Sequence, residues 1–428
     1  MKTKRSLTSF LSIISLCICF YLNAFAQTND PGQITHEPIT QQLITMMDHN
    51  AELKKMLVDS IASAKKHNPD RVMNPAQSLE EYYGFIDWAI KAMPWSILPN
   101  LPYSSLYDQI DQSLDYFYYI NDQPLAALKN KGYYNNSLQY HEPYRTWLIN
   151  FVKEWGMYLI TEPSWSDEYY QKALADEKFG LQKGWYEDPS HWKTFNEFFA
   201  RYLKSPDQRP IASPDDPSVI SSPADSTPQG VWKIDRNSNI EGKKGVRIKS
   251  TLFKSVAALI GEDSAYKNAF ANGTLTHTFL DVNDYHRYHF PIGGKVKEVR
   301  IILSDTAVGG ITTWDAKSKR YILESNTPGW QNTETRGCVI IETKEYGLVA
   351  LLPIGMSQVS SVNFEKTVEV GNTFKKGDML GYFLFGGSDF VILFQNKVSF
   401  ILMSSKQDSG SYKHLLMGEE YGRVSLRK

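Results

Sequence analysis

The sequence is poor in cysteine and almost neutral, and both features exclude classes of protein. Only three cysteines occur in 428 residues, and Cys17 and Cys19 lie close to the N-terminus. If that segment is removed, Cys338 remains alone, which leaves no internal disulfide and no cysteine-rich zinc site. The formal net charge of −1 provides no positive surface of the kind that binds nucleic acid, so we expect no nucleic-acid partner.

Long apolar runs are missing apart from one stretch near the start. That stretch resembles a secretory signal. Residues 10–22 are apolar but short for a membrane span, and they follow the basic residues Lys2, Lys4 and Arg5. Ala24 and Ala26 supply the small side chains that signal peptidase requires. We therefore predict a signal peptide over residues 1–26 and an exported protein, periplasmic or secreted, whose net charge becomes −4. An uncleaved N-terminal anchor is the alternative.

The remaining chain changes character near residue 205. Over residues 27–204 apolar side chains recur at three- and four-residue spacing, as in Leu53, Met56, Leu57 and Ile61, which predicts helices. Residues 205–228 are rich in Pro, Asp and Ser and form a junction. Beyond it, β-branched runs at 296–302, 337–342, 347–353 and 390–395 predict strands, with a helix at 252–260. The predicted fold class is α+β, with a helical N-terminal domain (27–204) and a β-rich domain (205–428).

A Gly-Gly-Ser sequence lies between two of the apolar runs. Gly386, Gly387 and Ser388 are typical of an ordinary turn, and that interpretation is the commoner one. Two glycines also permit the backbone conformations that self-cleavage would need. A serine hydroxyl can attack the preceding carbonyl only when the peptide is twisted from planarity.

Two further segments contain residues that could assist a nucleophile. His286 and His289 could act as base and acid if both reach one pocket. They could also bind a metal, but no carboxylate or third histidine lies at ligand spacing, so we predict no metal site. Asp225, in the junction, is typical of a turn or helix cap unless a histidine needs orienting. Residue spacing alone does not show that these side chains meet.

Together these segments resemble the phosphatidylserine decarboxylase family. The resemblance covers residues 192–428 and includes four motifs in order: Trp192-Lys193-Thr194-Phe195-Asn196-Glu197-Phe198-Phe199-Ala200-Arg201 with Arg209-Pro210-Ile211, then Ser222-Pro223-Ala224-Asp225, then Asp284-Tyr285-His286-Arg287 with His289, and finally Gly387-Ser388. A glycine-containing turn at residues 370–378 is similar to lipoyl-type barrel-sandwich domains. The resemblance therefore implies a barrel-sandwich-like catalytic domain.

The resemblance also implies roles for individual residues. Asp225, His289 and Ser388 would form a self-processing triad that cuts the chain between Gly387 and Ser388. Ser388 would become a covalent pyruvoyl cofactor at the start of a small chain, residues 388–428, which would stay bound to the large chain. His286 would act in decarboxylation as a proton donor. Asp389 departs from the family, which generally has Thr or Ser there; it would act on a substrate carboxylate or be tied to a basic neighbour.

Two substrates fit the resemblance, and a different kind of function remains open. The region before residue 192, together with stretches near residues 335–337, 355–361 and 385–388, is similar to pyruvoyl L-tryptophan decarboxylases, which favours a free amino acid. Phosphatidylserine would require peripheral membrane contact, and residues 82–101, with Trp88 and Trp95, could form an interfacial helix. That stretch is more typical of protein core. The non-enzyme alternative is an unprocessed binding or scaffold protein on the same fold.

Overall fold

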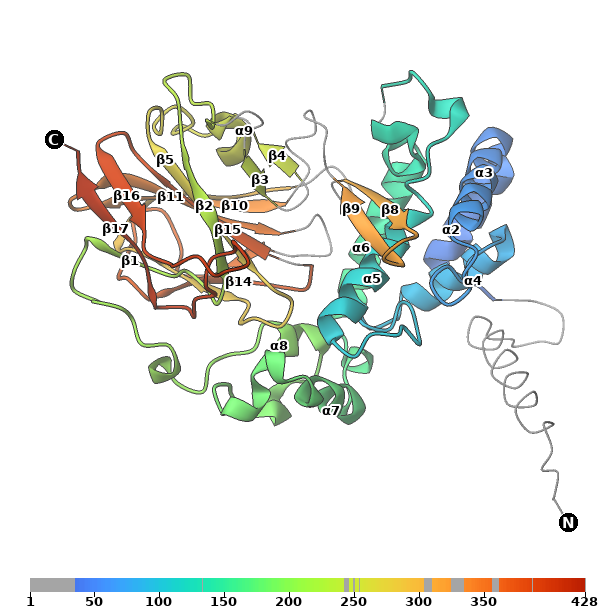
Figure 1. The fold of residues 1–428 in the computed structure, drawn as a ribbon, viewed down its shortest axis with the longest axis horizontal. Coiled ribbons are helices and arrows are strands. Elements are labelled where there is room, and N and C mark those ends of the chain that lie inside the picture. Colours follow the sequence, from blue (N-terminus) through green and yellow to red (C-terminus); the bar gives the residue numbers. More distant parts are fainter. Residues whose placement is uncertain are drawn as a thin grey trace, which may run out of the picture.

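The computed structural model describes residues 35–132, 134–241, 246–248, 251–253, 255–303, 310–324, 335–355, 362–386 and 388–427. The predicted signal peptide and Gly387 lie outside these ranges. Figure 1 shows a helical region beside a strand-rich region, and the chain passes from the first to the second as predicted. The α+β fold class is therefore confirmed. Among the described strands the sheets are open and do not close into a barrel.

The helical region contains seven described α-helices and several short 3₁₀ turns. They are α2 (Pro38–His49), α3 (Ala51–His67), α4 (Leu79–Ala89), α5 (Leu106–Tyr119), α6 (Tyr144–Tyr158), α7 (Asp167–Ala175) and α8 (Phe195–Phe199). Helix α3 begins where the Asn50 side chain accepts a hydrogen bond from the Leu53 amide. It buries the spaced apolar residues that predicted it, including Leu53 and Leu57. Helix α8 begins with a capping box between Thr194 and Glu197.

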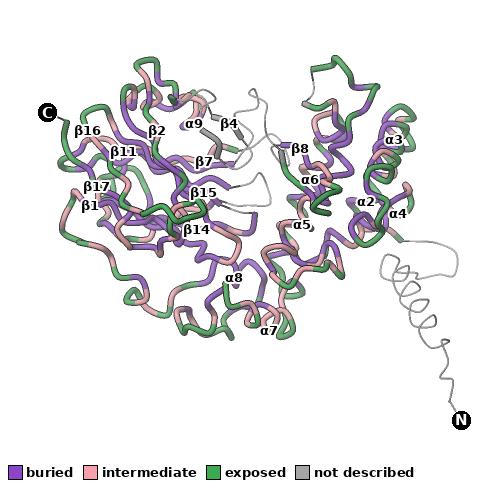
Figure 2. Tube along the Cα trace, viewed as in Figure 1, coloured by how far each residue is buried: buried purple, intermediate pink, exposed green. Residues whose placement is uncertain are grey.

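The strand-rich region is built on a seven-stranded antiparallel sheet. Its spatial order is β13 (Thr373–Phe374), β7 (Gly294–Ile302), β10 (Arg336–Thr343), β11 (Gly347–Gly355), β15 (Ser388–Phe394), β5 (Thr274–Leu280) and β2 (Thr227–Lys233). The four strands predicted from β-branched runs correspond to β7, β10, β11 and β15. Because β15 is central, both faces are buried along its whole length (Figure 2).

Smaller sheets surround this one. Strands β12 (Val362–Phe364), β14 (Met379–Phe383) and β6 (Arg287–His289) form one, and β1 (Val219–Ser221), β17 (Glu420–Leu426) and β16 (Val398–Leu402) form another. The helix predicted over 252–260 is shorter than expected. Helix α9 (Val256–Ile260) begins after the Ser255 cap, and the preceding residues form β4 (Thr251–Phe253), paired with β3 (Val246–Ile248). The capping serine ends the strand and starts the helix.

One hairpin of the strand-rich half packs against the helices. Strands β8 (Ile311–Asp315) and β9 (Arg320–Glu324) lie beside α5 (Figure 1). The Tyr321 amide donates to the Gln112 side-chain oxygen at 2.7 Å, and the Gln112 amide group donates back to the Tyr321 carbonyl at 3.0 Å. The helical region is thus completed by residues from beyond position 205.

The segment considered as an interfacial helix belongs to the core. Helix α4 ends at Ala89, and Trp95 is only 1% exposed, with its ring against Trp165 and Phe195. In the described ranges, no helix is both long and apolar enough to cross a membrane.

Candidate active site

Ser388 is the first residue of β15 and lies inside the protein. It pairs with Gly355 of β11 on one side and with Leu280 of β5 on the other. Its side chain is fully buried, and its Oγ has no hydrogen-bond partner among the described residues. An unsatisfied buried hydroxyl is destabilising by about 1–3 kcal/mol, so the Ser388 hydroxyl does not stabilise the fold through hydrogen bonds to the described residues.

The chain before Ser388 is held by helix α8. The Phe385 amide donates to the Asn196 side-chain oxygen at 2.9 Å, and the Phe385 ring packs edge-on against Phe195 and Phe199, with both ring centroids at 5.4 Å. Gly386 follows with φ +142°, a conformation that residues with side chains rarely adopt. The helical region therefore positions the segment that leads to the predicted cleavage point.

His286 lies against the same helix. Its ring is fully buried and stacks on Phe199 at a centroid distance of 3.8 Å. Its carbonyl accepts a hydrogen bond from the Phe383 amide at 2.9 Å, at the end of β14. Because the chain runs from Phe383 to Ser388 in five residues, His286 stands beside the segment that carries the serine.

His289 is held in one tautomer. Its Nδ1 lies 2.8 Å from the Gly377 carbonyl, which can only accept, so Nδ1 carries the proton. The other nitrogen, Nε2, lies 3.3 Å from the Tyr285 hydroxyl. Burial lowers the pKa of His289 to about 4, so the ring is neutral at physiological pH with an unprotonated Nε2. This is the form required of a general base.

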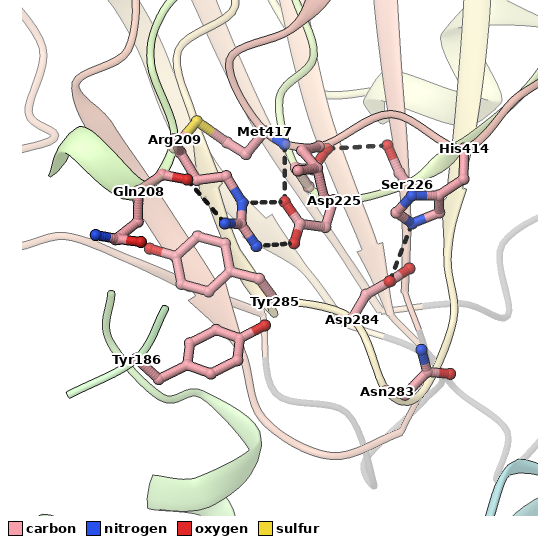
Figure 3. Close-up of polar contacts among 12 residues, drawn as sticks. Tyr186, Gln208, Arg209, Asp225, Ser226, Asn283, Asp284, Tyr285, His414 and Met417 are labelled. Atoms are coloured by element: carbon pink, nitrogen blue, oxygen red, sulfur yellow. Dashed lines mark hydrogen bonds and ion pairs between the residues drawn. The ribbon is translucent and has the colours of Figure 1, made fainter. Parts of the chain in front are cut away.

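Asp225 is bound by an arginine. Arg209 donates from Nε and Nη2 to the two carboxylate oxygens at 2.9 and 2.6 Å, and the Met417 amide adds a third bond at 2.7 Å (Figure 3). Both side chains of this ion pair are almost completely buried. The guanidinium lies over the Trp185 ring, 4.3 Å from its centroid.

The motif loops do meet, but the three triad side chains do not join through hydrogen bonds. The His289 amide donates to the Pro223 carbonyl at 2.8 Å, which places the Asp225 loop beside β6. No hydrogen bond connects Asp225 with His289 or His289 with Ser388 in the described structure. The Gly377 carbonyl fixes the tautomer of His289, whereas the predicted triad assigns the orientation of the histidine to Asp225. The triad therefore stays a prediction.

Asp284 and Tyr285 belong to a motif identified in the sequence, but no role was predicted for either residue, and their neighbour His414 was not identified. Asp284 is buried and bonded to His414 at 3.0 Å; burial raises the pKa of Asp284 to about 6 (Figure 3). Tyr285 precedes His289 by four residues in the same motif, but the sequence alone does not show that its hydroxyl contacts His289. No group of three or more His, Cys, Asp or Glu side chains in the described ranges is arranged to hold a metal ion.

Comparison with known proteins places these motifs in one family. Residues 195–423 match the family model described as phosphatidylserine decarboxylase. Phosphatidylserine decarboxylase proenzyme 2 of rice is 33% identical over 204 residues, which is 48% of this chain and 30% of the rice protein. The corresponding proenzyme of Coxiella burnetii (strain RSA 493) is 27% identical over 295 residues, or 65% of this chain and 92% of the relative.

A third relative has a different name. Decarboxylase iboD of Amanita muscaria is 28% identical over 277 residues, covering 59% of this chain and 77% of the relative. The chain thus spans under a third of the rice protein and most of the other two. The family match covers more than half of the chain and extends from the first motif, which it enters at Phe195, past Ser388. The chain belongs to the phosphatidylserine decarboxylase family.

Proposed function

We propose that this protein is a decarboxylase that cuts its own chain between Gly387 and Ser388 and converts Ser388 into a pyruvoyl group. The buried Ser388 hydroxyl, which has no hydrogen-bond partner among the described residues, is the observation that carries the proposal. The rice and Coxiella relatives are named proenzymes, which agrees with processing. Asp225, His286, His289 and Ser388 lie within the residues that match the family model, in the segments that resemble the family's motifs.

The cutting step balances without an added oxidant or reductant. Ser388 Oγ attacks the Gly387 carbonyl carbon, the bond from that carbon to the nitrogen of residue 388 breaks, and an ester forms. Loss of the α-proton of residue 388 then expels the Gly387 carboxylate. Water replaces the nitrogen, which leaves as ammonia, so the sequence consumes one water and gives a keto group. His289 Nε2, unprotonated through burial, accepts the proton of Ser388 Oγ in this proposal.

The chain's own side chains would prepare the site for decarboxylation. A pyruvoyl carbonyl supplies an electron sink for the electron pair released as CO2 leaves. His286, fixed against Phe199, would return a proton to the product. The buried aromatic rings of Phe199 and Phe385 would exclude water from the reacting atoms. Arg209 would hold Asp225 in place beside β6 through its two hydrogen bonds.

A free amino acid is the substrate that we favour. Trp95 and the apolar face of α4 are part of the core and leave no interfacial helix of the kind considered for a membrane-bound substrate. The Amanita relative is named a decarboxylase without mention of a phospholipid. Phosphatidylserine is the second candidate because the rice and Coxiella relatives are named for it. We also propose that the protein is exported by the signal predicted over residues 1–26.

Gel electrophoresis with intact-mass measurement tests the cut. The parent protein should give a large chain ending at Gly387 and a small chain, residues 388–428, whose N-terminus is blocked. Ser388→Ala should remain one chain. Ser60→Ala, which removes an equally buried hydroxyl from the helical region, is the matched control and should split normally. A parent that stays whole, with no reaction with hydrazine, would contradict the proposal and favour the unprocessed scaffold.

The substrate is tested separately on split protein. Release of CO2 from a panel of free amino acids and from phosphatidylserine vesicles should favour the amino acids. Activity only on the vesicles would make phosphatidylserine the substrate while leaving the self-cleavage proposal intact.

A further inference from the structure

A buried, hydrogen-bonded pair formed by a histidine and an aspartate lies behind the proposed cofactor residue. Asp389 follows Ser388 on β15, and its Oδ1 is hydrogen-bonded to Nε2 of His277 on β5. Asp389 is 1% exposed and His277 is 4% exposed. Successive residues of a strand point to opposite faces, so Asp389 and Ser388 face away from each other.

The two faces of β15 meet different cores, which confirms this separation. Phe390 and Ile392, on the Ser388 side, belong to the large core shared with the helical region. Val391 and Leu393, on the Asp389 side, belong to a smaller core beneath α9. Asp389 therefore cannot act on a substrate carboxylate held at residue 388. Of the two roles considered from the sequence, the structure supports the tie to a basic neighbour.

The apolar surroundings of this pair indicate that it contributes little to the stability of the sheet. The pair has apolar neighbours on the sheet: Val391 lies opposite His277 in the strand register, and Ile354 lies opposite Asp389. The centroid of the Trp232 ring is 6.3 Å from that of the His277 ring. Replacing a buried ion pair by apolar residues of similar volume is commonly neutral or stabilising. Stability alone therefore gives little reason for a histidine and an aspartate here.

Cutting of the chain changes how residue 388 is held, and the pair would matter after this change. In the uncut chain, residue 388 is held by a peptide bond on each side. After conversion to a pyruvoyl group it has lost both the bond to Gly387 and its backbone nitrogen, so it can no longer donate to the sheet. Asp389 becomes the first residue with a backbone N–H and the first with an anchored side chain. Its partner, His277, belongs to the large chain.

We infer that the His277–Asp389 pair is a positioning device that holds the cofactor-bearing end of the small chain in register on the large chain after cutting. This inference rests on the proposed self-cleavage. The pair connects the large chain to the small chain, one residue away from the reacting carbonyl. It lies on the face of the sheet opposite the substrate. A frayed strand end would move that carbonyl relative to His286, and a displacement of about 1 Å is enough to lower a rate by about a hundredfold.

A double variant separates positioning from stability. His277→Leu/Asp389→Val removes both members of the pair together, so neither is left buried opposite a missing partner, and its melting temperature should stay close to that of the parent. It should split into two chains, yet kcat for CO2 release should fall by about tenfold or more while KM changes by less than about twofold. Asp389→Asn, which keeps a hydrogen-bonding side chain, should retain most of kcat.

The matched control removes a different buried contact between the same two chains. Thr276 of β5 and Tyr421 of the small chain are bonded through their hydroxyls at 2.6 Å, away from residue 388. Thr276→Val should keep the parent kcat; Tyr421 is left unchanged because its hydroxyl also donates to the His277 carbonyl at 3.3 Å. Parent kcat in the His277→Leu/Asp389→Val variant would overturn the inference, as would failure of that variant to split, which would place the pair in the cutting step. A parent that does not split would instead refute the proposed function.

Discussion

The pKa of His289 makes a strong prediction about the pH dependence of self-cleavage. The ordinary pKa of a histidine is 6.5, and burial lowers that of His289 to about 4. This difference corresponds to about 3 kcal/mol in favour of the neutral ring. The unprotonated base is present above the pKa and is lost as the pH falls through it. The cutting rate should therefore stay flat from neutral pH down to about pH 5 and fall with a midpoint near pH 4.

The difference from an ordinary histidine is large enough to measure. At pH 5.5 a histidine with a pKa of 6.5 is about 9% neutral, whereas one with a pKa of about 4 is about 97% neutral. The cutting rate at that pH should thus be roughly tenfold higher than an unperturbed histidine would allow. Cell-free synthesis followed by dilution into buffers of graded pH, with the split read on gels, gives the rate directly.

A neighbouring carboxyl provides the necessary control. Asp284 has a pKa of about 6, and His414 is bonded to it, so titration of this pair could also produce a loss of rate near pH 6. The profile is therefore measured again in Asp284→Asn, which should keep the midpoint near pH 4. A midpoint near pH 6.5 in both proteins would refute the argument that His289 is a buried, neutral base.

Three further variants test the surroundings of the site. Arg209→Ala should lower the free energy of unfolding by about 3–5 kcal/mol, measured by thermal melting, because it leaves Asp225 buried without its partner; an unchanged melting temperature would show that the ion pair is not formed. Asn196→Ala should slow cutting by leaving the buried Phe385 amide unsatisfied, about 1–3 kcal/mol, and an unaltered rate would exclude this contact from positioning the segment. Tyr321→Phe removes a hydroxyl that donates to the Met73 carbonyl at 2.6 Å, so the β8–β9 hairpin should be cut faster in limited proteolysis; equal protease resistance would contradict its docking role.

Much of the fold follows from local pattern. The four predicted β-branched strands are present because alternation and apolar runs reflect burial directly. Helix 252–260 was predicted too long because Ser255 caps α9, and a cap is a weaker signal than the apolar residues on both sides. The docking of β8–β9 on α5 could not be predicted. It depends on contacts such as Tyr321 with Gln112, whose partners are 209 residues apart.

For the candidate site, the residues could be identified from the sequence but their contacts could not. Motif order identified Asp225, His286, His289 and Ser388, but the hydrogen-bond partners of these residues depend on tertiary geometry. An aspartate in a loop is compatible with a histidine or an arginine partner, and only the folded chain places Arg209 against Asp225. The tautomer of His289 is set by a backbone carbonyl, and every residue has one, so sequence offers no signal for it.

Strand periodicity alone nevertheless carried more information about Asp389 than the sequence analysis used. Once β15 is accepted as a strand that begins at Ser388, the two-residue period already sends the next side chain to the opposite face. A carboxylate there, with both faces of a central strand buried, requires a partner, because an isolated buried charge is unstable by several kcal/mol. Residue 277 of the neighbouring strand β5 is the nearby histidine that meets this requirement. A buried charge in a central strand therefore predicts a partner on the adjacent strand, and here that partner connects the two chains that the proposed cut would create.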